Sequence, residues 1–190
     1  MNYQGTQLLE HPVQRVWDAL LDPAVLRQCI AGCETFERTS DTDFASTVKV
    51  SIGPVAARFN STVSLADVAA PHRCTLRFSG QGGVAGFGKG EARVTLAETA
   101  PGQTRLDWSA DAQVGGKIAQ LGARLIEGTV RKMSEDFFQR FVAQLASGAS
   151  AAAPVPVATP PAASTGTRWP WVVALLAGAG ALLWLLGRAA

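Results

Sequence analysis

Apolar and polar side chains alternate along five segments in the first two thirds of the chain. The alternation runs over residues 47–52, 55–65, 73–78, 91–96 and 105–112, and weaker versions run over 3–10 and 34–40. Successive side chains of a β-strand point to opposite faces of the sheet. The pattern therefore predicts five strong and two weaker antiparallel strands, with one apolar face and one face in water.

Helical spacing replaces this alternation near the N-terminus. Apolar residues between Val13 and Leu21 recur every three or four positions after Pro12, which predicts a short helix. Asp22 and Pro23 have the residue types of a helix cap and a first helical position, so a second short helix is expected to follow.

A long apolar stripe begins after Gly115 and Gly116 and extends from Ile118 to Leu145. It predicts one helix of about 30 residues. No other predicted element is long enough to cover the apolar face of the sheet. The sequence therefore predicts an α+β fold, in which an antiparallel sheet curls around one long C-terminal helix and two short helices close one end.

Two regions of different composition follow this domain, which spans residues 1–146. Residues 147–168 are rich in alanine and proline and contain no acidic or aromatic residue, as is typical of a linker. Residues 169–186 are apolar and uncharged, and as a helix they would extend roughly 27 Å, close to the thickness of a bilayer core. We expect a single-pass C-terminal membrane anchor there.

Three tryptophans and the charges agree with this interpretation. Trp169, Trp171 and Trp184 lie near the ends of the predicted transmembrane helix, where indole rings prefer the membrane interface. The N-terminus has no signal-peptide pattern, which predicts that the domain stays in the cytoplasm. Residues 1–146 carry 15 Lys/Arg and 15 Asp/Glu, so the domain has no net positive charge to attract nucleic acid.

Residues that would carry catalysis or hold a metal are few. His11 and His72 lie far apart, and each is next to a proline. Cys29 and Cys33 lack the C-x-x-C redox spacing, and Cys74 has the pattern of a packed thiol. No Ser/His/Asp set or carboxylate pair shares a motif. We therefore expect no metal site and no enzymatic activity of the chain itself.

Glycine recurs along residues 80–90, but the segment links two strands, and its spacing does not match the nucleotide-binding motifs. Two interpretations stay open. The segment is either a plain turn or a flexible hairpin over a cavity mouth, with Gly83 and Gly86 acting as a gate. Arg124 either lines the same entrance or belongs to a solvated helix face.

The order of elements resembles the helix-grip fold of START-like and birch-pollen-allergen-like proteins, in which a space is left between sheet and helix. Small inward-facing residues such as Cys74 and Ala92 favour a cavity. The predicted lining consists of Val50, Ile52, Val55, Phe59, Phe78, Phe87, Trp108, Leu121 and Leu125. The alternative is that the same side chains pack closely as a solid core.

Four motifs of the domain form a recognisable set. They are the run over residues 12–23, Cys29-Ile30-Ala31-Gly32-Cys33, Ile52-Gly53-Pro54-Val55, and the run over 114–126 with its specific Gly115-Gly116-Lys117-Ile118 start. This set resembles the motifs of the CoxG family, which is associated with carbon monoxide dehydrogenase. Ala31 departs from the family pattern, which has proline at that point. The resemblance covers residues 1–146.

The resemblance implies an accessory protein of a molybdenum hydroxylase of the carbon monoxide dehydrogenase type, located at the cytoplasmic face of the inner membrane. It implies that the cavity takes a lipophilic ligand, a respiratory quinone, and that no cofactor is covalently bound. The alternative is a membrane-recruitment adaptor with a packed core and no ligand. A third hypothesis, an enzyme, would need a buried acid or base, but Asp107 and Asp111 fall on the wet face of their strand.

Overall fold

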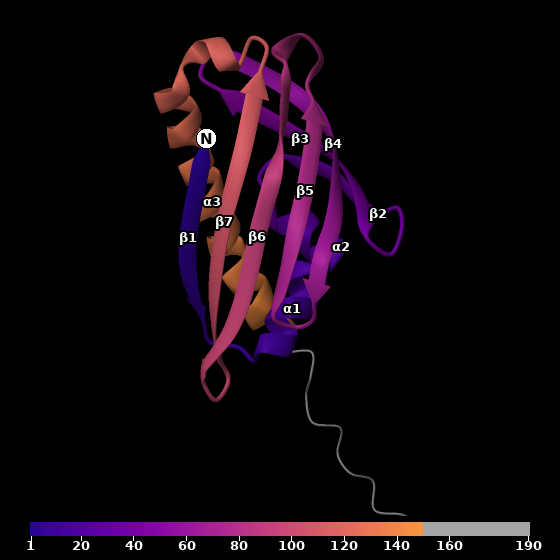
Figure 1. Ribbon diagram of the computed structural model, residues 1–190, viewed down its shortest axis with the longest axis vertical. Coiled ribbons are helices and arrows are strands. Elements are labelled where there is room, and N and C mark those ends of the chain that lie inside the picture. The colour runs from indigo at the N-terminus through magenta and orange to yellow at the C-terminus, as the bar shows by residue number, and fades with distance from the viewer. Residues whose placement is uncertain (150–190) are drawn as a thin grey trace, which may run out of the picture. The chain divides into compact units, whose positions relative to one another are not determined.

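The computed structural model describes residues 1–149 of the chain (Figure 1). Its elements are β1 (Asn2–Leu9), α1 (Val13–Leu20), α2 (Pro23–Cys29), β2 (Cys33–Arg38), β3 (Asp43–Ile52), β4 (Val55–Ala69), β5 (Arg73–Gln81), the 3-10 turn η1 (Gly83–Ala85), β6 (Phe87–Ala100), β7 (Gln103–Gly115), the 3-10 turn η2 (Ala119–Leu121) and α3 (Ala123–Ala149). The five strong and two weaker predicted strands all form.

The strands make one antiparallel sheet in the order β1-β7-β6-β5-β4-β3-β2. Consecutive strands pair as hairpins, except that β1 pairs with the last strand, with Leu9 opposite Thr104 and Asn2 opposite Asp111. The alternation of apolar and polar residues predicted an antiparallel sheet with one apolar face, because it makes only one face of each strand suitable for a core.

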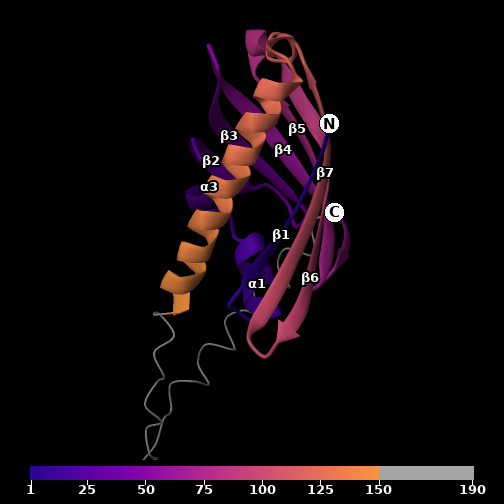
Figure 2. The same ribbon diagram turned by 90° about the vertical axis from the view of Figure 1, so that its left-hand side faces the viewer.

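All three helices lie on the same face of the sheet, and α3 crosses it diagonally (Figure 2). The start of α2 follows the sequence signal closely: Pro23 is its first residue, and the Asp22 carboxylate accepts a 2.8 Å hydrogen bond from the Ala24 backbone N–H. Such a cap satisfies one of the N–H groups that a helix start leaves free. Both predicted short helices are confirmed.

The long helix begins later than the sequence predicted. Gly122 adopts φ +91°, in the left-handed region, and separates η2 from α3. The prediction of one uninterrupted helix from Ile118 onward was therefore wrong at its start. Leu125, predicted to face inward, is 41% exposed, whereas Ile126 is 2% exposed. Counted from Ile126, the buried side of α3 continues at intervals of three or four residues to Phe141 and Leu145, as a helix requires.

Two clusters of buried residues form the core of the domain, and the first of them holds α3 to the sheet. The first lies around α1 and the end of α3, where Phe141 is 0% exposed and packs with Val16 and Trp17. An Arg15 guanidinium N–H donates to the carbonyl of Leu145 at the same end. The second cluster lies at the opposite end of α3 and comprises Phe59, Ala85, Ile118 and the partly buried Val50, Val55, Ala57 and Val114.

Within residues 1–149, no helix has both the length and the apolar character needed to cross a membrane. The predicted anchor at 169–186, with Trp169, Trp171 and Trp184, lies outside the described residues, as does most of the predicted linker. Helix α3 continues to Ala149, past the boundary predicted at residue 146.

Candidate ligand-binding cavity

An apolar cavity of about 470 Å³ lies between the sheet and the helices. From the helices and the loop after α2, it is lined by Trp17, Leu20, Leu21, Leu26, Ile30 and Ala31. From α3, it is lined by Val130, Met133, Ser134, Phe137 and Phe138. The helical spacing of these α3 positions turns one continuous side of the helix toward the cavity.

The sheet supplies the opposite wall of the cavity. Its lining residues on the central strands are Val63, Cys74, Leu76, Ala92 and Val94, with Leu106 and Trp108 on β7 and Phe36 on the edge strand β2. These positions have even spacing along each strand, so their side chains share the inner face. Cys74 and Ala92 are two of the small residues that favoured a cavity at the sequence level. Their short side chains leave space that a larger residue would fill.

Aromatic rings connect the cavity wall to the first core cluster. The Trp108 and Phe138 rings stack with centroids 6.3 Å apart, and Phe138 meets Phe137 edge-on at 5.2 Å. Phe137 in turn stacks on the fully buried Phe141 at 5.7 Å. Aromatic pairs in these geometries have fixed orientations, so this wall offers a preformed surface for a flat ring.

Few polar groups reach the cavity. Its lining contains no carboxylate, histidine, lysine or arginine side chain, and Ser134 supplies its one hydroxyl. Cys74 contributes a thiol, but burial raises the pKa of this thiol and keeps it protonated and weakly nucleophilic at neutral pH. The cavity can therefore bind an apolar molecule but has no acid, base or activated nucleophile within its lining.

One buried donor in the cavity wall lacks a partner. Trp108 Nε1 is inaccessible to solvent and forms no hydrogen bond with any described residue. The edge of the indole that carries Nε1 lies over Gly5 of β1, where an added Cβ would be only 2.7 Å from Nε1. A buried N–H without an acceptor is costly. Because Gly5 covers Nε1, an oxygen of a ligand in the cavity can reach this N–H only if the indole ring turns away from β1.

A second hollow of about 490 Å³ lies on the other side of this wall, between β1 and α3. Trp108, Val130, Ser134 and Phe138 line both spaces and so separate them. This side hollow has polar walls that include Tyr3, whose pKa is raised by burial and by the nearby Glu127 carboxylate. The apolar cavity and the polar hollow thus meet at Trp108.

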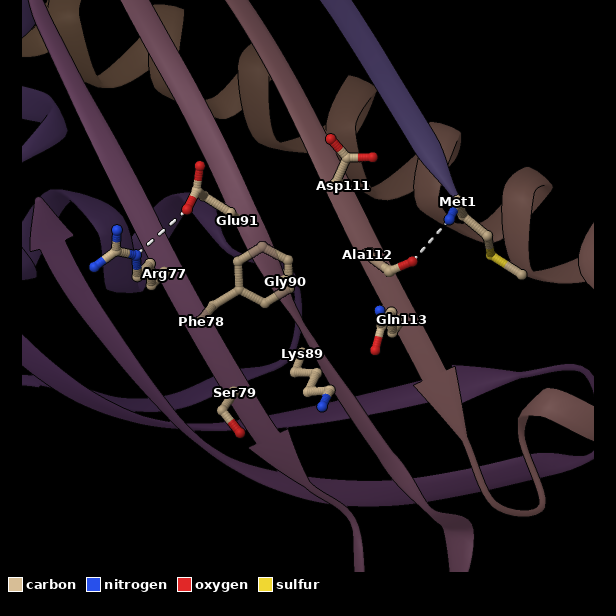
Figure 3. Close-up of a pocket in the computed structure, with 10 residues that line it drawn as sticks. All are labelled: Met1, Arg77, Phe78, Ser79, Lys89, Gly90, Glu91, Asp111, Ala112 and Gln113. Carbon is tan, nitrogen blue, oxygen red and sulfur yellow. Dashed lines mark hydrogen bonds and ion pairs between the residues drawn. The ribbon is translucent and has the colours of Figure 1, made fainter. Parts of the chain in front are cut away.

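A third hollow, of about 550 Å³, lies against β5, β6 and β7 (Figure 3). It is larger, but charged side chains surround it, including Arg77 and Glu91, which form a 3.3 Å ion pair. The Phe78 ring lies across Gly90, where an added Cβ would come within 2.8 Å of it (Figure 3). The apolar cavity remains the better candidate for a lipophilic ligand, because its walls carry no charge.

The residues predicted to line the cavity do not lie together in the structure. Trp108 lines the apolar cavity and Phe78 lines the charged hollow of Figure 3. Val50, Val55 and Phe59 pack in the second core cluster. None of these three is among the cavity residues.

The remaining predicted lining residues also lie outside the cavity. Ile52 is buried at 8% exposure, and Leu121 is half-buried in η2. Phe87 and Leu125 are 37% and 41% exposed. The predicted lining left out Phe137, although it falls on the predicted apolar stripe between Ile118 and Leu145, and it left out Leu26 and Phe138.

The predicted gate residues lie beside the second core cluster and are not among the cavity-lining residues. Gly83 begins η1 and Gly86 follows it, with φ of +59° and +117°. The backbone of Gly86 packs against that of Gly115, where a Cβ would approach the carbonyl oxygen to 2.0 Å. Arg124 is exposed on the first turn of α3.

The other candidate chemical groups do not converge. Cys29 is fully buried and Cys33 half-buried, and burial raises the pKa of both thiols. Asp107 faces outward, where a hydrogen bond from Thr6 lowers the pKa of its carboxyl group, and Asp111 is exposed. Within residues 1–149, no three His, Cys, Asp or Glu side chains are arranged to hold a metal ion.

Solved structures share this fold. A conserved protein from Geobacillus kaustophilus is 28% identical, with a TM-score of 0.73 over 78% of this chain and 97% of that one. The ZhuI aromatase/cyclase from Streptomyces sp. R1128 is 14% identical, with a TM-score of 0.62 over 82% of this chain and 99% of that one.

A START superfamily protein from Mycobacterium smegmatis is 12% identical, with a TM-score of 0.60 over 77% of this chain and 97% of that one. These likenesses confirm the START-like fold, an antiparallel sheet with a long C-terminal helix, that the order of elements predicted.

None of the curated proteins compared with the chain matches it. The sequence profile of the CoxG family, which is named for a subunit of carbon monoxide dehydrogenase, matches residues 5–146. The matched residues make up most of the chain. They include both core clusters, the cavity and the motifs noted in the sequence. The chain therefore belongs to the carbon monoxide dehydrogenase CoxG family.

Proposed function

We propose that this protein carries a lipophilic ligand, a respiratory quinone, in its apolar cavity and serves as an accessory protein of a molybdenum hydroxylase of the carbon monoxide dehydrogenase type. The observation that carries the proposal is the cavity of about 470 Å³, whose lining contains no charged side chain. Pockets of this size and character suit ligands that are mostly apolar. A packed-core adaptor, the alternative, would need no such space.

We further propose that the Trp108 ring turns away from Gly5 when a ligand binds, which brings its unpartnered indole N–H to an acceptor oxygen of the ligand. A quinone ring offers a flat face to the Phe137 and Phe138 rings and a carbonyl oxygen to Trp108 Nε1. A pure hydrocarbon would fill the same volume but leave the buried donor unsatisfied. The proposed orientation therefore places the ring at Trp108 and the isoprenoid tail along the aliphatic wall formed by Leu76 and Val94.

The family name supports the proposed partner, a carbon monoxide dehydrogenase or a related hydroxylase. We place the protein at the cytoplasmic face of the inner membrane, tethered by residues 169–186. The 22-residue linker at 147–168 would let the domain move about 25 Å if flexible, enough to approach both lipid and a docked enzyme. In this role the chain transfers a ligand and catalyses no reaction itself.

The direct test is to extract the full chain, purified in mild detergent, with organic solvent and identify the cargo by mass spectrometry. We expect a quinone enriched relative to the same preparation of a cavity-filled variant. We also expect added quinone to raise the melting temperature and to quench the fluorescence of Trp17 and Trp108, which both line the cavity. Absence of all three results would contradict the proposal.

Trp108→Phe should selectively weaken ligands that carry a carbonyl group, because it keeps an aromatic ring and removes the N–H. We expect a loss of roughly three- to tenfold in affinity for 2-methyl-1,4-naphthoquinone, the range of one neutral hydrogen bond. The matched control ligand is 2-methylnaphthalene, whose affinity should change by less than about twofold because it has no acceptor oxygen. Displacement of a fluorescent apolar probe measures both, and equal losses for the two ligands would exclude a hydrogen bond from Trp108.

A further inference from the structure

Three connections meet at the end of the domain that holds the second core cluster. They are the β3–β4 hairpin, the β5–β6 segment with η1, and the β7–α3 segment with η2, seen together at the upper end of Figure 1. The Ile118 backbone N–H donates to the Ala85 carbonyl at 2.9 Å, and a Cβ on Gly53 would come within 2.9 Å of Leu125. We call residues 49–58, 80–90 and 114–125 the loop end.

Apolar side chains protrude from the loop end. Val84, at the tip of the β5–β6 segment, is 96% exposed, although the next residue, Ala85, is buried at 3%. Phe87 and Leu125 are 37% and 41% exposed. The buried Ala85 holds the segment to the core, so the exposure of Val84 is fixed by the fold and does not result from a loose loop.

The charges of the loop end are all of one sign. It contains Lys49, Arg58, Lys89, Lys117 and Arg124 and no Asp or Glu. Residues 1–146 as a whole carry 15 Lys/Arg and 15 Asp/Glu. Arg58 is paired with Glu34 at 2.9 Å. The other four cations are exposed and form no salt bridge with any described residue.

The nearest acidic residues do not cancel this charge. Glu91, next to the loop end, is shared between Arg77 and Arg93 at 3.3 and 2.9 Å. Glu127 lines the side hollow beside Tyr3. The rest of residues 1–146 has 10 Lys/Arg against 15 Asp/Glu, since five of the 15 basic residues lie in the loop end. The domain is therefore electrically polarised.

We propose that the loop end docks on an anionic lipid surface, with Val84, Phe87 and Leu125 inserted among the headgroups and Lys49, Lys89, Lys117 and Arg124 facing lipid phosphates. Exposed apolar side chains ringed by cations are the combination that interfacial binding uses, because insertion and attraction to anionic lipid add together. This contact rests on the proposed membrane location and is separate from the tail at 169–186. It orients the domain on the bilayer, whereas a tail alone only tethers it.

The test uses the full chain and places a fluorescent label at one end of the domain or at the other. In a Cys33→Ser background, which leaves the buried Cys29 and Cys74 untouched, bimane is attached at Val84→Cys or at the control Val68→Cys. Val68 is also exposed, at 48%, but lies near the far end of β4. The chain is added to vesicles of brominated phosphatidylcholine, with or without phosphatidylglycerol, and bromine quenching reports contact with lipid.

We expect strong quenching at position 84 on the vesicles that contain phosphatidylglycerol, weak quenching there on neutral vesicles, and little at position 68 on either. Lys89→Glu with Lys117→Glu should raise the anionic lipid needed for half-maximal quenching by about tenfold or more. Arg27→Glu with Arg73→Glu makes the same change in net charge outside the loop end and should have a much smaller effect.

Vesicle flotation in parallel separates this proposal from the tail. If the chain floats with neutral vesicles but position 84 is never quenched, the tail binds and the docking proposal is wrong. Equal quenching at positions 84 and 68 also overturns it. If the chain fails to float with neutral vesicles but position 84 is quenched on anionic ones, docking is supported and the proposed anchor is wrong. Quenching on neither lipid overturns docking and favours a protein surface as the occupant.

Discussion

Ala92→Phe is expected to weaken ligand binding strongly while leaving the protein folded. Ala92 lies in the middle of the sheet wall of the cavity, between strands that carry Cys74 and Trp108, so an added benzyl group would occupy space proposed for the quinone ring. Overpacking of an occupied site costs about 1–3 kcal/mol, which corresponds to a loss of roughly 5- to 150-fold in affinity. In the protein without ligand, the added phenyl ring fills part of the empty cavity. We therefore expect the melting temperature to stay the same or rise.

The measurement compares quinone titrations of the full chain and its variants by tryptophan quenching and by thermal shift. Ala100→Phe is the matched control, because Ala100 lies on the same strand β6 but is exposed at its end. It should bind quinone as the parent chain does. Unchanged binding by Ala92→Phe would show that the ligand lies elsewhere, and joint loss of binding and of the melting transition would point to misfolding instead.

The architecture could be predicted from the sequence because each element repeats one signal many times. The strands alternate apolar and polar side chains, which indicates the face that each residue occupies, and α2 begins at the Asp22 cap that the sequence indicated. The start of α3 was mispredicted for a local reason. Ile118 and Leu121 continue the apolar spacing across Gly122, and periodicity contains no information about the φ of +91° that breaks the helix there.

The sequence indicated which face of the sheet lines the cavity, but not where along that face the cavity lies. Val50, Val55 and Phe59 are partly or fully buried, but they lie at the level of the sheet where Ala85 and Ile118 pack against them. Alternation tells which face a strand residue occupies and not what stands opposite it. The cavity lies further along the sheet, where Ala92 has a small side chain and the Phe137 and Phe138 rings of α3 leave space between helix and sheet. The orientation of the Trp108 N–H depends on Gly5, a contact between residues far apart in sequence.

Phe141→Ala is expected to produce the largest loss of stability in the domain, about 3–5 kcal/mol in the free energy of unfolding. Phe141 is 0% exposed, belongs to the first core cluster and stacks on Phe137. Truncation removes this packing and leaves a void that α1 and the sheet cannot close, because Arg15 and the strand register hold them in place. Urea unfolding of the full chain in mild detergent, followed by circular dichroism, measures the change.

Val142→Ala is the matched control, since Val142 is the next residue of α3 and is 45% exposed. Both substitutions replace a residue of modest helix propensity with alanine, so the difference between them isolates burial. We expect the control to stay within about 0.5 kcal/mol of the parent. Because Phe137 lines the cavity and loses its stacking partner, Phe141→Ala should also weaken quinone binding in the fraction that remains folded. A loss of stability equal to that of the control would show that the end of α3 is not part of the core, and the aromatic wall would then lack its support.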